Sequence, residues 1–164
     1  MVVSAPVFSP RFINREAELR VFRERFSEAA AGMGSTLLIS GDAGIGKSRL
    51  LAVFRSDVEA AGGYFAHAQC LDHSSTPLTP FADVLTALDA ALPSVLAEQR
   101  TLRRALEDVL LGPGASSNAT NDRRGLQNAI VTALRSFAAA RPTVITIDDA
   151  QWADAPSLRW LSHL

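Results

Sequence analysis

The sequence predicts an α/β fold in which helices cover a parallel β-sheet. Short apolar runs typical of strands alternate with longer segments whose apolar residues recur every three or four positions, as in amphipathic helices. A glycine-rich segment, residues 41–46, joins the first such run to a helical segment. The β-branched run Thr143–Ile147 is followed directly by two aspartates. These three observations indicate strands joined by helical crossovers, and such connections give parallel pairing.

Composition sets the limits of this interpretation. The chain has 164 residues, of which 48% are hydrophobic and 20% charged, as in one globular domain. A formal net charge of −1 excludes a polyanion-binding surface over the whole chain. The single cysteine, Cys70, excludes an internal disulfide. Because no signal-peptide pattern or run of about 18 apolar residues is present, we expect a cytoplasmic protein.

The first elements are a helix and a strand. Residues 1–11 carry serine and proline interruptions and predict an extended lead-in. The spacing of apolar residues predicts a helix over 14–31, with Asn14 as its N-cap, and residues 32–34 end it. Residues 35–40 (STLLIS) are mostly apolar and too short for a helix, so they predict a buried strand.

A second helix and strand complete a βαβ unit. The helix begins near Lys47 after the glycine-rich segment and ends at Gly62-Gly63. Its predicted apolar face consists of Leu50, Leu51, Phe54 and Val58. Residues 64–70 predict the next strand. Strand, loop, helix and strand in this order imply a parallel pair of strands.

The second half of the chain predicts further helices around one strand. We expect helices over 81–92, 94–111 and 122–140. Residues 143–147 predict a strand buried on both faces. Asp154 is placed to cap a last helix.

Residues 41–48 (GDAGIGKS) match the pattern G-x-x-x-x-G-K-[ST] of a phosphate-binding loop, the Walker A motif. Glycines allow successive backbone N–H groups to turn inward, and the following helix points the positive end of its dipole at the same place. Lys47 then reaches the β- and γ-phosphates, and the Ser48 hydroxyl is suited to bind Mg²⁺. The alternative is a glycine turn followed by a surface lysine. The candidate nucleotide-binding residues are Gly41, Asp42, Ala43, Gly44, Ile45, Gly46, Lys47, Ser48 and Arg49.

The cation composition supports the phosphate-loop interpretation. Fifteen of the 16 basic residues are arginines, and Lys47 is the single lysine. A compact ammonium on a thin stem fits a phosphate cradle that a broad, planar guanidinium would not. We therefore assign Lys47 a catalytic role in phosphate chemistry.

Residues 144–149 (VITIDD) have the form of a Walker B strand. An apolar strand of this kind delivers Asp148 beside the phosphate loop, where it can hold Mg²⁺ together with Ser48. Asp149, one residue later, is the candidate catalytic residue that orients or deprotonates the attacking water. The alternative is that both acids only cap the next turn.

Three blocks of residues carry a family resemblance. Residues 12–19 (FINREAEL), 41–50 (GDAGIGKSRL) and 148–158 (DDAQWADAPSL) resemble the N-terminal motif, phosphate loop and Walker B extension of STAND/AAA-type P-loop ATPase domains. The chain is most similar to those of large LuxR-type bacterial transcriptional regulators. This chain departs from the N-terminal motif by carrying Asn14 where the family has glycine.

The resemblance implies a P-loop NTPase fold, a three-layer αβα sandwich with a parallel sheet. It implies that residues 12–164 are the incomplete, N-terminal part of this nucleotide-binding domain, because the family's later strand, arginine finger and lid have no counterpart here. It also implies ATP and Mg²⁺ as cofactors and places Arg15 near the adenine. The expected partners are ATP or ADP and, through nucleotide-dependent self-association, a second copy; no membrane or direct nucleic-acid contact is expected from this segment.

Three functions remain open at this point. The first is an ATP-binding switch with slow ATP hydrolysis, serving signal transduction or transcriptional control. In that case hydrolysis belongs to the full-length protein, and this segment either hydrolyses ATP or only binds it. The second is a P-loop kinase for small molecules, although no arginine-rich lid follows the Walker B strand. The third is a fragment that acts only in interactions and binds no nucleotide.

Overall fold

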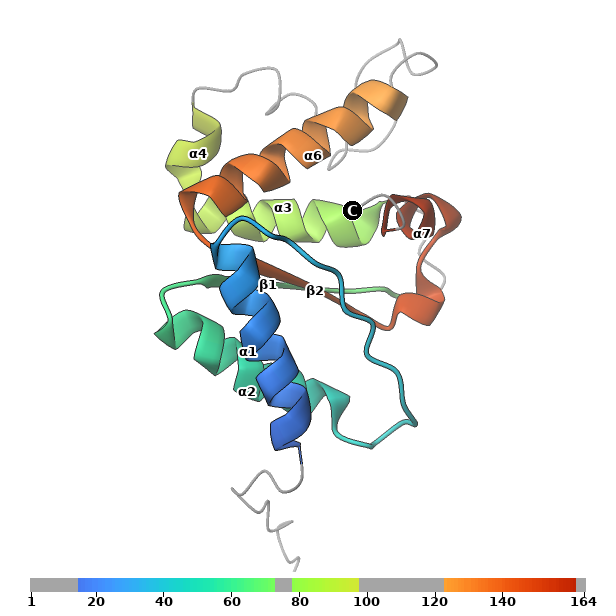
Figure 1. Ribbon diagram of the computed structural model, residues 1–164. Coiled ribbons are helices and arrows are strands. Elements are labelled where there is room, and N and C mark those ends of the chain that lie inside the picture. Colours follow the sequence, from blue (N-terminus) through green and yellow to red (C-terminus); the bar gives the residue numbers. More distant parts are fainter. Residues whose placement is uncertain (1–14, 73–77, 98–122, 162–164) are drawn as a thin grey trace, which may run out of the picture. The chain divides into compact units, whose positions relative to one another are not determined.

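The computed structural model describes residues 15–72, 78–97 and 123–161, so the predicted lead-in over 1–11 lies outside the described residues (Figure 1). The chain divides into two compact units, Met1–Asp57 and Val58–Leu164. We describe each unit by itself.

The first unit is built on an aromatic contact between two helices. Helix α1 spans Glu16–Ala30, close to the predicted range, but its N-cap is Arg15 and not the predicted Asn14. Helix α2 spans Lys47–Ala60, mostly within this unit. The Phe22 and Phe54 rings lie 5.0 Å apart, and Phe26 meets Phe54 edge-on at 6.5 Å. Gly32 ends α1 at a φ of 90°, a conformation that favours glycine.

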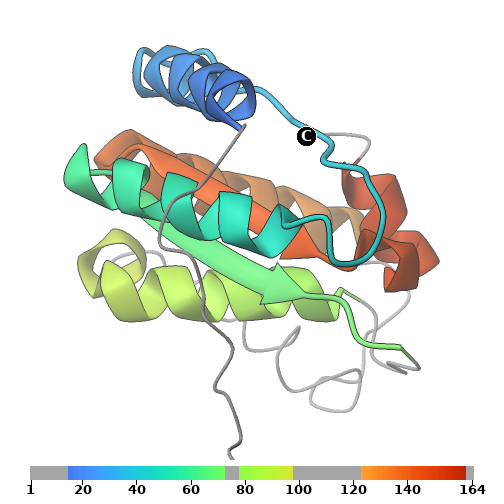
Figure 2. The ribbon, with the colours of Figure 1, turned by 90° about the horizontal axis from the view of Figure 1, so that it is seen from below.

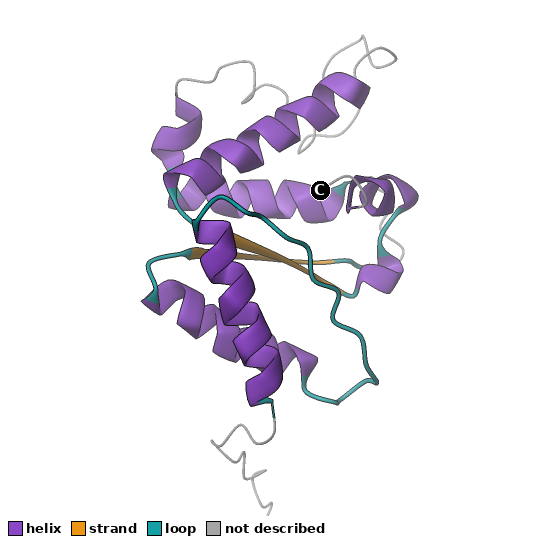
Figure 3. Cartoon of the chain, in the orientation of Figure 1, coloured by secondary structure: helices purple, strands orange, loops and turns teal. Residues whose placement is uncertain are grey.

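The predicted strand over residues 35–40 is wrong for the structure described. These residues belong to one continuous loop between α1 and α2 (Figure 3), and the Leu38 side chain is 89% exposed. A strand is stabilised by a ladder of hydrogen bonds to a neighbouring strand, and none of the described residues supplies this neighbour. Leu37 and Leu38, two of the apolar residues that suggested burial, are therefore exposed at the surface.

The second unit contains a two-stranded parallel sheet. Strand β1 (Tyr64–Gln69) pairs with β2 (Thr143–Asp148) residue for residue, from Tyr64 opposite Thr143 to Gln69 opposite Asp148. This pairing confirms these two strands and a parallel sheet, whereas the predicted βαβ unit is wrong, because residues 35–40 form a loop and not its first strand. The prediction that residues 143–147 are buried on both faces is wrong, because all six β2 residues are only half-buried. Strand β2 has one neighbour in a two-stranded sheet, so its other edge is not covered by pairing among the described residues.

Helices α3 and α6 lie on one side of these strands and form the core with β1 (Figures 1 and 2). Helix α3 spans Thr79–Ala91 and α6 spans Arg123–Ala140, close to the predicted ranges. The fully buried side chains of this core include Phe81, Val84, Leu85, Leu88, Ile130 and Phe137. The chain therefore has the α/β fold class that the sequence predicts.

Three short helices complete the described part of the second unit. Helix α4 spans Pro93–Ala97, and the rest of the helix predicted over 94–111 lies outside the described residues. A 3₁₀ turn, η1, covers Ala150–Trp152, and α7 covers Ala155–Leu161. None of the described helices is long and apolar enough to cross a membrane.

The core packing predicts a large difference between two identical substitutions. Leu88 in α3 is fully buried, whereas Leu158 in α7 is 49% exposed. We expect Leu88→Ala to lower the free energy of unfolding by about 2–5 kcal/mol, because it removes buried methyl groups and leaves a cavity. Leu158→Ala, the matched control, is expected to cost less than about 1 kcal/mol. Urea unfolding of both variants measures this, and equal losses would contradict the described core.

Candidate nucleotide-binding site

The glycine-rich loop leads directly into the first turn of α2. Gly44 and Gly46 adopt φ angles of 79° and 97°, in the left-handed region where a side chain would be strained. The carbonyl of Gly46 accepts the N–H of Leu50 at 2.9 Å, so the helix begins at Lys47. The residues of the loop before Gly46 are exposed. Exposed backbone at a helix N-terminus offers N–H groups to an anion.

The ammonium of Lys47 folds back over the start of this loop. Its Nζ donates hydrogen bonds to the carbonyl oxygens of Gly41 at 2.9 Å and Asp42 at 3.1 Å. Lys47 is half-buried, whereas the next two residues, Ser48 and Arg49, are exposed. The positive charge is thereby held beside the N-terminus of α2.

The two aspartates after β2 are held in different ways. Asp148, the last residue of the strand, accepts the backbone N–H of Asp149 on Oδ1 at 2.9 Å. Asp149 lies at φ 53° and ψ 40°, a left-handed conformation uncommon for a residue with a side chain. Its carboxylate accepts one hydrogen bond from Gln69 Nε2 at 2.9 Å and one from Gln151 Nε2 at 3.0 Å. The contact to Gln69 joins residues 80 positions apart.

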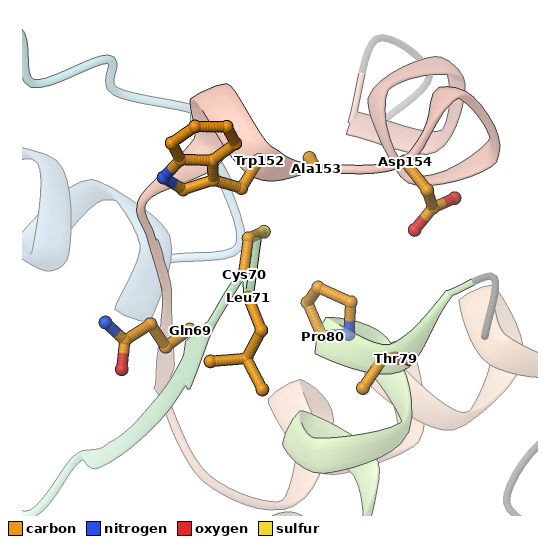
Figure 4. Close-up of a pocket in the computed structure, with 8 residues that line it drawn as sticks. All are labelled: Gln69, Cys70, Leu71, Thr79, Pro80, Trp152, Ala153 and Asp154. Carbon is orange, nitrogen blue, oxygen red and sulfur yellow. The ribbon is translucent and has the colours of Figure 1, made fainter. Parts of the chain in front are cut away.

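Asp154 ties the segment after β2 to the beginning of α3. Its Oδ1 accepts the N–H of Ser157 at 2.9 Å, which confirms the predicted cap of α7. Its Oδ2 accepts the Ser157 hydroxyl at 2.6 Å and the backbone N–H of Leu78 at 3.2 Å. Figure 4 shows the Asp154 carboxylate directed toward the start of α3.

A small hollow lies between these elements, and Cys70 lines it (Figure 4). Cys70 is 4% exposed, as expected for a small buried residue. Burial raises the pKa of its thiol, and the negative charges of Asp154, Asp149 and Asp148 raise it further. The thiol therefore stays protonated near neutral pH and is not an activated nucleophile. Trp152, which also lines the hollow, is half exposed.

Arg15, the residue expected near the adenine, forms an ion pair with a residue of the helix that it begins. It occupies the N-cap position of α1 and makes an ion pair of 2.6 Å with Glu18. The hydrogen bond from Arg15 lowers the pKa of the Glu18 carboxyl. This pair is exposed enough for solvent to screen it.

The predicted site residues therefore form two groups. Arg15, Lys47 and Ser48 belong to the first unit, and Asp148 and Asp149 belong to the second. Sequence reasoning missed the contact of Gln69 with Asp149, since only the register of the sheet places Gln69 beside the aspartates. Within the described part of the chain, no group of three or more His, Cys, Asp and Glu side chains could hold a metal ion. A Mg²⁺ ion needs fewer protein ligands than that, because it usually keeps several waters.

The Asp154 contacts predict a stability loss when the carboxylate is removed. Asp154→Ala leaves the buried Ser157 hydroxyl, which is 1% exposed, without this acceptor and removes the cap of α7. We expect the free energy of unfolding to fall by about 2–3 kcal/mol. Asp154→Asn keeps an oxygen for the cap and should lose less. Thermal and urea unfolding measure both variants. If the free energy of unfolding of the alanine variant falls by less than about 0.5 kcal/mol, the Asp154 hydrogen bonds contribute little to stability.

Comparison with known proteins gives the family. The sequence matches the AAA ATPase domain family over residues 11–164. It is 33% identical over 165 residues to an uncharacterized protein of Rhizobium meliloti (strain 1021), a match that covers 88% of this chain and 16% of that protein. No solved structure matches the chain. Nearly the whole chain, including the glycine-rich loop and both aspartates, thus belongs to the AAA ATPase domain family.

Proposed function

We propose that this chain binds Mg·ATP and, as part of a switch module, hydrolyses it slowly. The observation that carries the proposal is the position of Lys47, on the first residue of α2 with its ammonium bonded to the loop carbonyls. Membership of the AAA ATPase domain family supports a nucleotide as the ligand.

In this proposal the loop residues 41–46 and the first turn of α2 hold the phosphates. The loop residues before Gly46 are exposed, and the dipole of α2 favours a polyanion at its N-terminus. Lys47 exchanges its two carbonyl contacts for β- and γ-phosphate oxygens, which bind an ammonium more strongly than neutral carbonyls do. Arg49 lies beside the same turn, and Arg15 is proposed to lie on the adenine side.

The metal-binding and catalytic roles extend this proposal to the second unit. Ser48 offers an exposed hydroxyl and Asp148 a carboxylate, both hard oxygen ligands of the kind that Mg²⁺ prefers. A bound Mg²⁺ would neutralise charge on the phosphates. Asp149 would orient the attacking water and accept its proton. These roles require the two units to bring Ser48 and Asp148 to one cation.

The biological role that we propose is regulatory. The extension from Asp148 to Leu158 has the form found in large LuxR-type transcriptional regulators, which supports a nucleotide-dependent switch in a signalling or transcriptional protein. We also propose that residues 12–164 are part of a larger nucleotide-binding domain. Two observations on the described residues support this: the apolar run over 35–40 pairs with no strand, and β2 has a neighbour on one edge alone, which a further strand would complete.

Substitution of the single lysine tests nucleotide binding. Lys47→Ala removes the ammonium from the loop, and we expect the Kd for Mg·ATP to rise at least about 10-fold, the loss of one charge-assisted hydrogen bond. Lys47→Arg should also weaken binding, because the guanidinium has the wrong shape. Isothermal titration calorimetry measures both, with the exposed Arg20→Ala on α1 as control. Equal affinity of wild type and Lys47→Ala, or no binding by wild type, would defeat the proposal.

Substitution of Asp149 separates binding from hydrolysis. Asp149→Asn keeps the shape of the side chain but removes the carboxylate that accepts a proton. We expect the Kd for Mg·ATP to stay within about twofold and the kcat for phosphate release to fall about 100-fold or more. Phosphate release at saturating ATP measures this. A variant that retains full turnover would exclude Asp149 as the catalytic base.

A further inference from the structure

The carboxylate of Asp154 bonds to the starts of two helices. Its Oδ1 accepts the backbone N–H of Ser157, in the first turn of α7. Its Oδ2 accepts the backbone N–H of Leu78, the N-cap residue of α3, and this bond joins residues 76 positions apart. Asp154 therefore ties the segment after β2 to the first turn of α3.

Leu78 has a backbone conformation that leucine rarely adopts. Its φ of 62° and ψ of 16° lie in the left-handed region, where a residue other than glycine is strained. Its carbonyl accepts the N–H groups of Phe81 at 3.0 Å and Ala82 at 3.1 Å, so the strained residue begins α3. Its side chain is 9% exposed and belongs to the core of the second unit. Such strain persists only where the surroundings hold the residue in place.

Asp154 is the support of Leu78 that comes from a distant segment. Among the described contacts of the Leu78 backbone, those with Phe81 and Ala82 lie within the first turn of α3 and would move with it. The bond to Asp154 fixes this turn from outside. Asp154 is anchored in its own segment, because its Oδ2 also accepts the hydroxyl of the buried Ser157 at 2.6 Å.

The first turn of α3 also forms one wall of the hollow that Cys70 lines. Pro80, in this turn, and Asp154 line the same hollow (Figure 4). The Cys70 side chain is 4% exposed, and it carries the single thiol of the chain. A movement of the first turn of α3 away from Asp154 would therefore uncover this thiol.

We propose that Asp154 is a latch that holds the first turn of α3 against the segment after β2. In the latched state Leu78 is left-handed and Cys70 is covered. When the bond from Leu78 to Asp154 breaks, Leu78 relaxes to a negative φ, the first turn of α3 moves away, and the thiol becomes accessible. The strain at Leu78 favours this local opening over global unfolding. The latch goes beyond the proposed function, since none of its contacts involves ATP.

The first test uses the wild-type, ligand-free chain. Hydrogen exchange followed by NMR compares the backbone amide of Leu78 with that of Leu88, which is fully buried in α3. We expect the opening constant at Leu78 to be at least about 10-fold larger and insensitive to low concentrations of urea, as for local opening. Labelling of Cys70 with the neutral reagent N-ethylmaleimide, relative to the urea-unfolded chain, should show the same opening. A Leu78 amide or a Cys70 thiol that opens only through global unfolding would overturn the proposal.

The second test uses Asp154→Asn, which separates the two backbone bonds of the carboxylate. The amide oxygen keeps the cap on the Ser157 N–H, and the NH₂ group then faces the Leu78 N–H, so that a donor meets a donor. We expect the opening constants at Leu78 and Cys70 to rise at least about 10-fold, as for the loss of one charge-assisted hydrogen bond. Opening constants equal to those of wild type would overturn the proposal.

Two control variants separate the latch from other effects of this substitution. Asp148→Asn also removes a negative charge that raises the pKa of the Cys70 thiol, but it leaves the bond to Leu78 in place. Ser157→Ala removes the buried hydroxyl and keeps both backbone bonds of Asp154. We expect the opening constant at Leu78 to stay within about threefold of wild type in both. A control that opens Leu78 as far as Asp154→Asn does would overturn the proposal.

The wild-type comparison of Leu78 with Leu88 decides the matter by itself if Asp154→Asn does not fold. No nucleotide enters any of these measurements. The fate of the latch and that of the proposed function are therefore determined separately.

Discussion

The residue-for-residue pairing of β1 with β2 is the interaction on which the second unit depends. It joins segments about 80 positions apart in the sequence and aligns their carboxyl ends at one edge. On one face it sets Ala66 and Ala68 against α3 and α6 to form the core. At the edge it sets Gln69 beside the aspartates. A shift of one residue would exchange the two faces, moving the core alanines outward and Gln69 away from Asp149.

Hydrogen bonds to the aspartates organise the carboxyl edge of this sheet. Asp149 accepts from two amides, and Asp154 accepts from two backbone N–H groups and a hydroxyl. The donors in these bonds are neutral, so they hold the carboxylates in place without adding positive charge. Burial is the largest cause of the raised pKa of the nearby Cys70 thiol, and the same negative charges raise this pKa further. An acidic edge of this kind suits a cation that arrives with a ligand.

Local patterns carried most of the correct predictions. Helical periodicity identified α1 and α6, β-branched composition identified β2, and residue type with position identified Asp154 as a cap. The strand over 35–40 was wrong because an apolar run reports hydrophobicity but not whether a partner strand is present. Gln69 was missed because its contact depends on register, which no pattern within a single strand contains. The proposed phosphate loop could be predicted because the residues of its motif are consecutive in the sequence.

Lys47 in the glycine-rich loop is the single lysine among 16 basic residues. Elsewhere the chain uses arginine for its positive charge, as in the bonds of Arg23 to Asp57 and Arg15 to Glu18. In these pairs the guanidinium contacts one carboxylate oxygen: Arg15 Nη1 meets Glu18 Oε1, and Arg23 Nε and Nη2 both meet Asp57 Oδ2. At Lys47 the acceptors are two carbonyls of adjacent loop residues, which converge on one point. A compact ammonium satisfies both. Under the proposed function it transfers to phosphate oxygens without the wide, planar approach that a guanidinium needs. The single lysine therefore lies at the position where a compact charge fits the two carbonyl acceptors better than a guanidinium would.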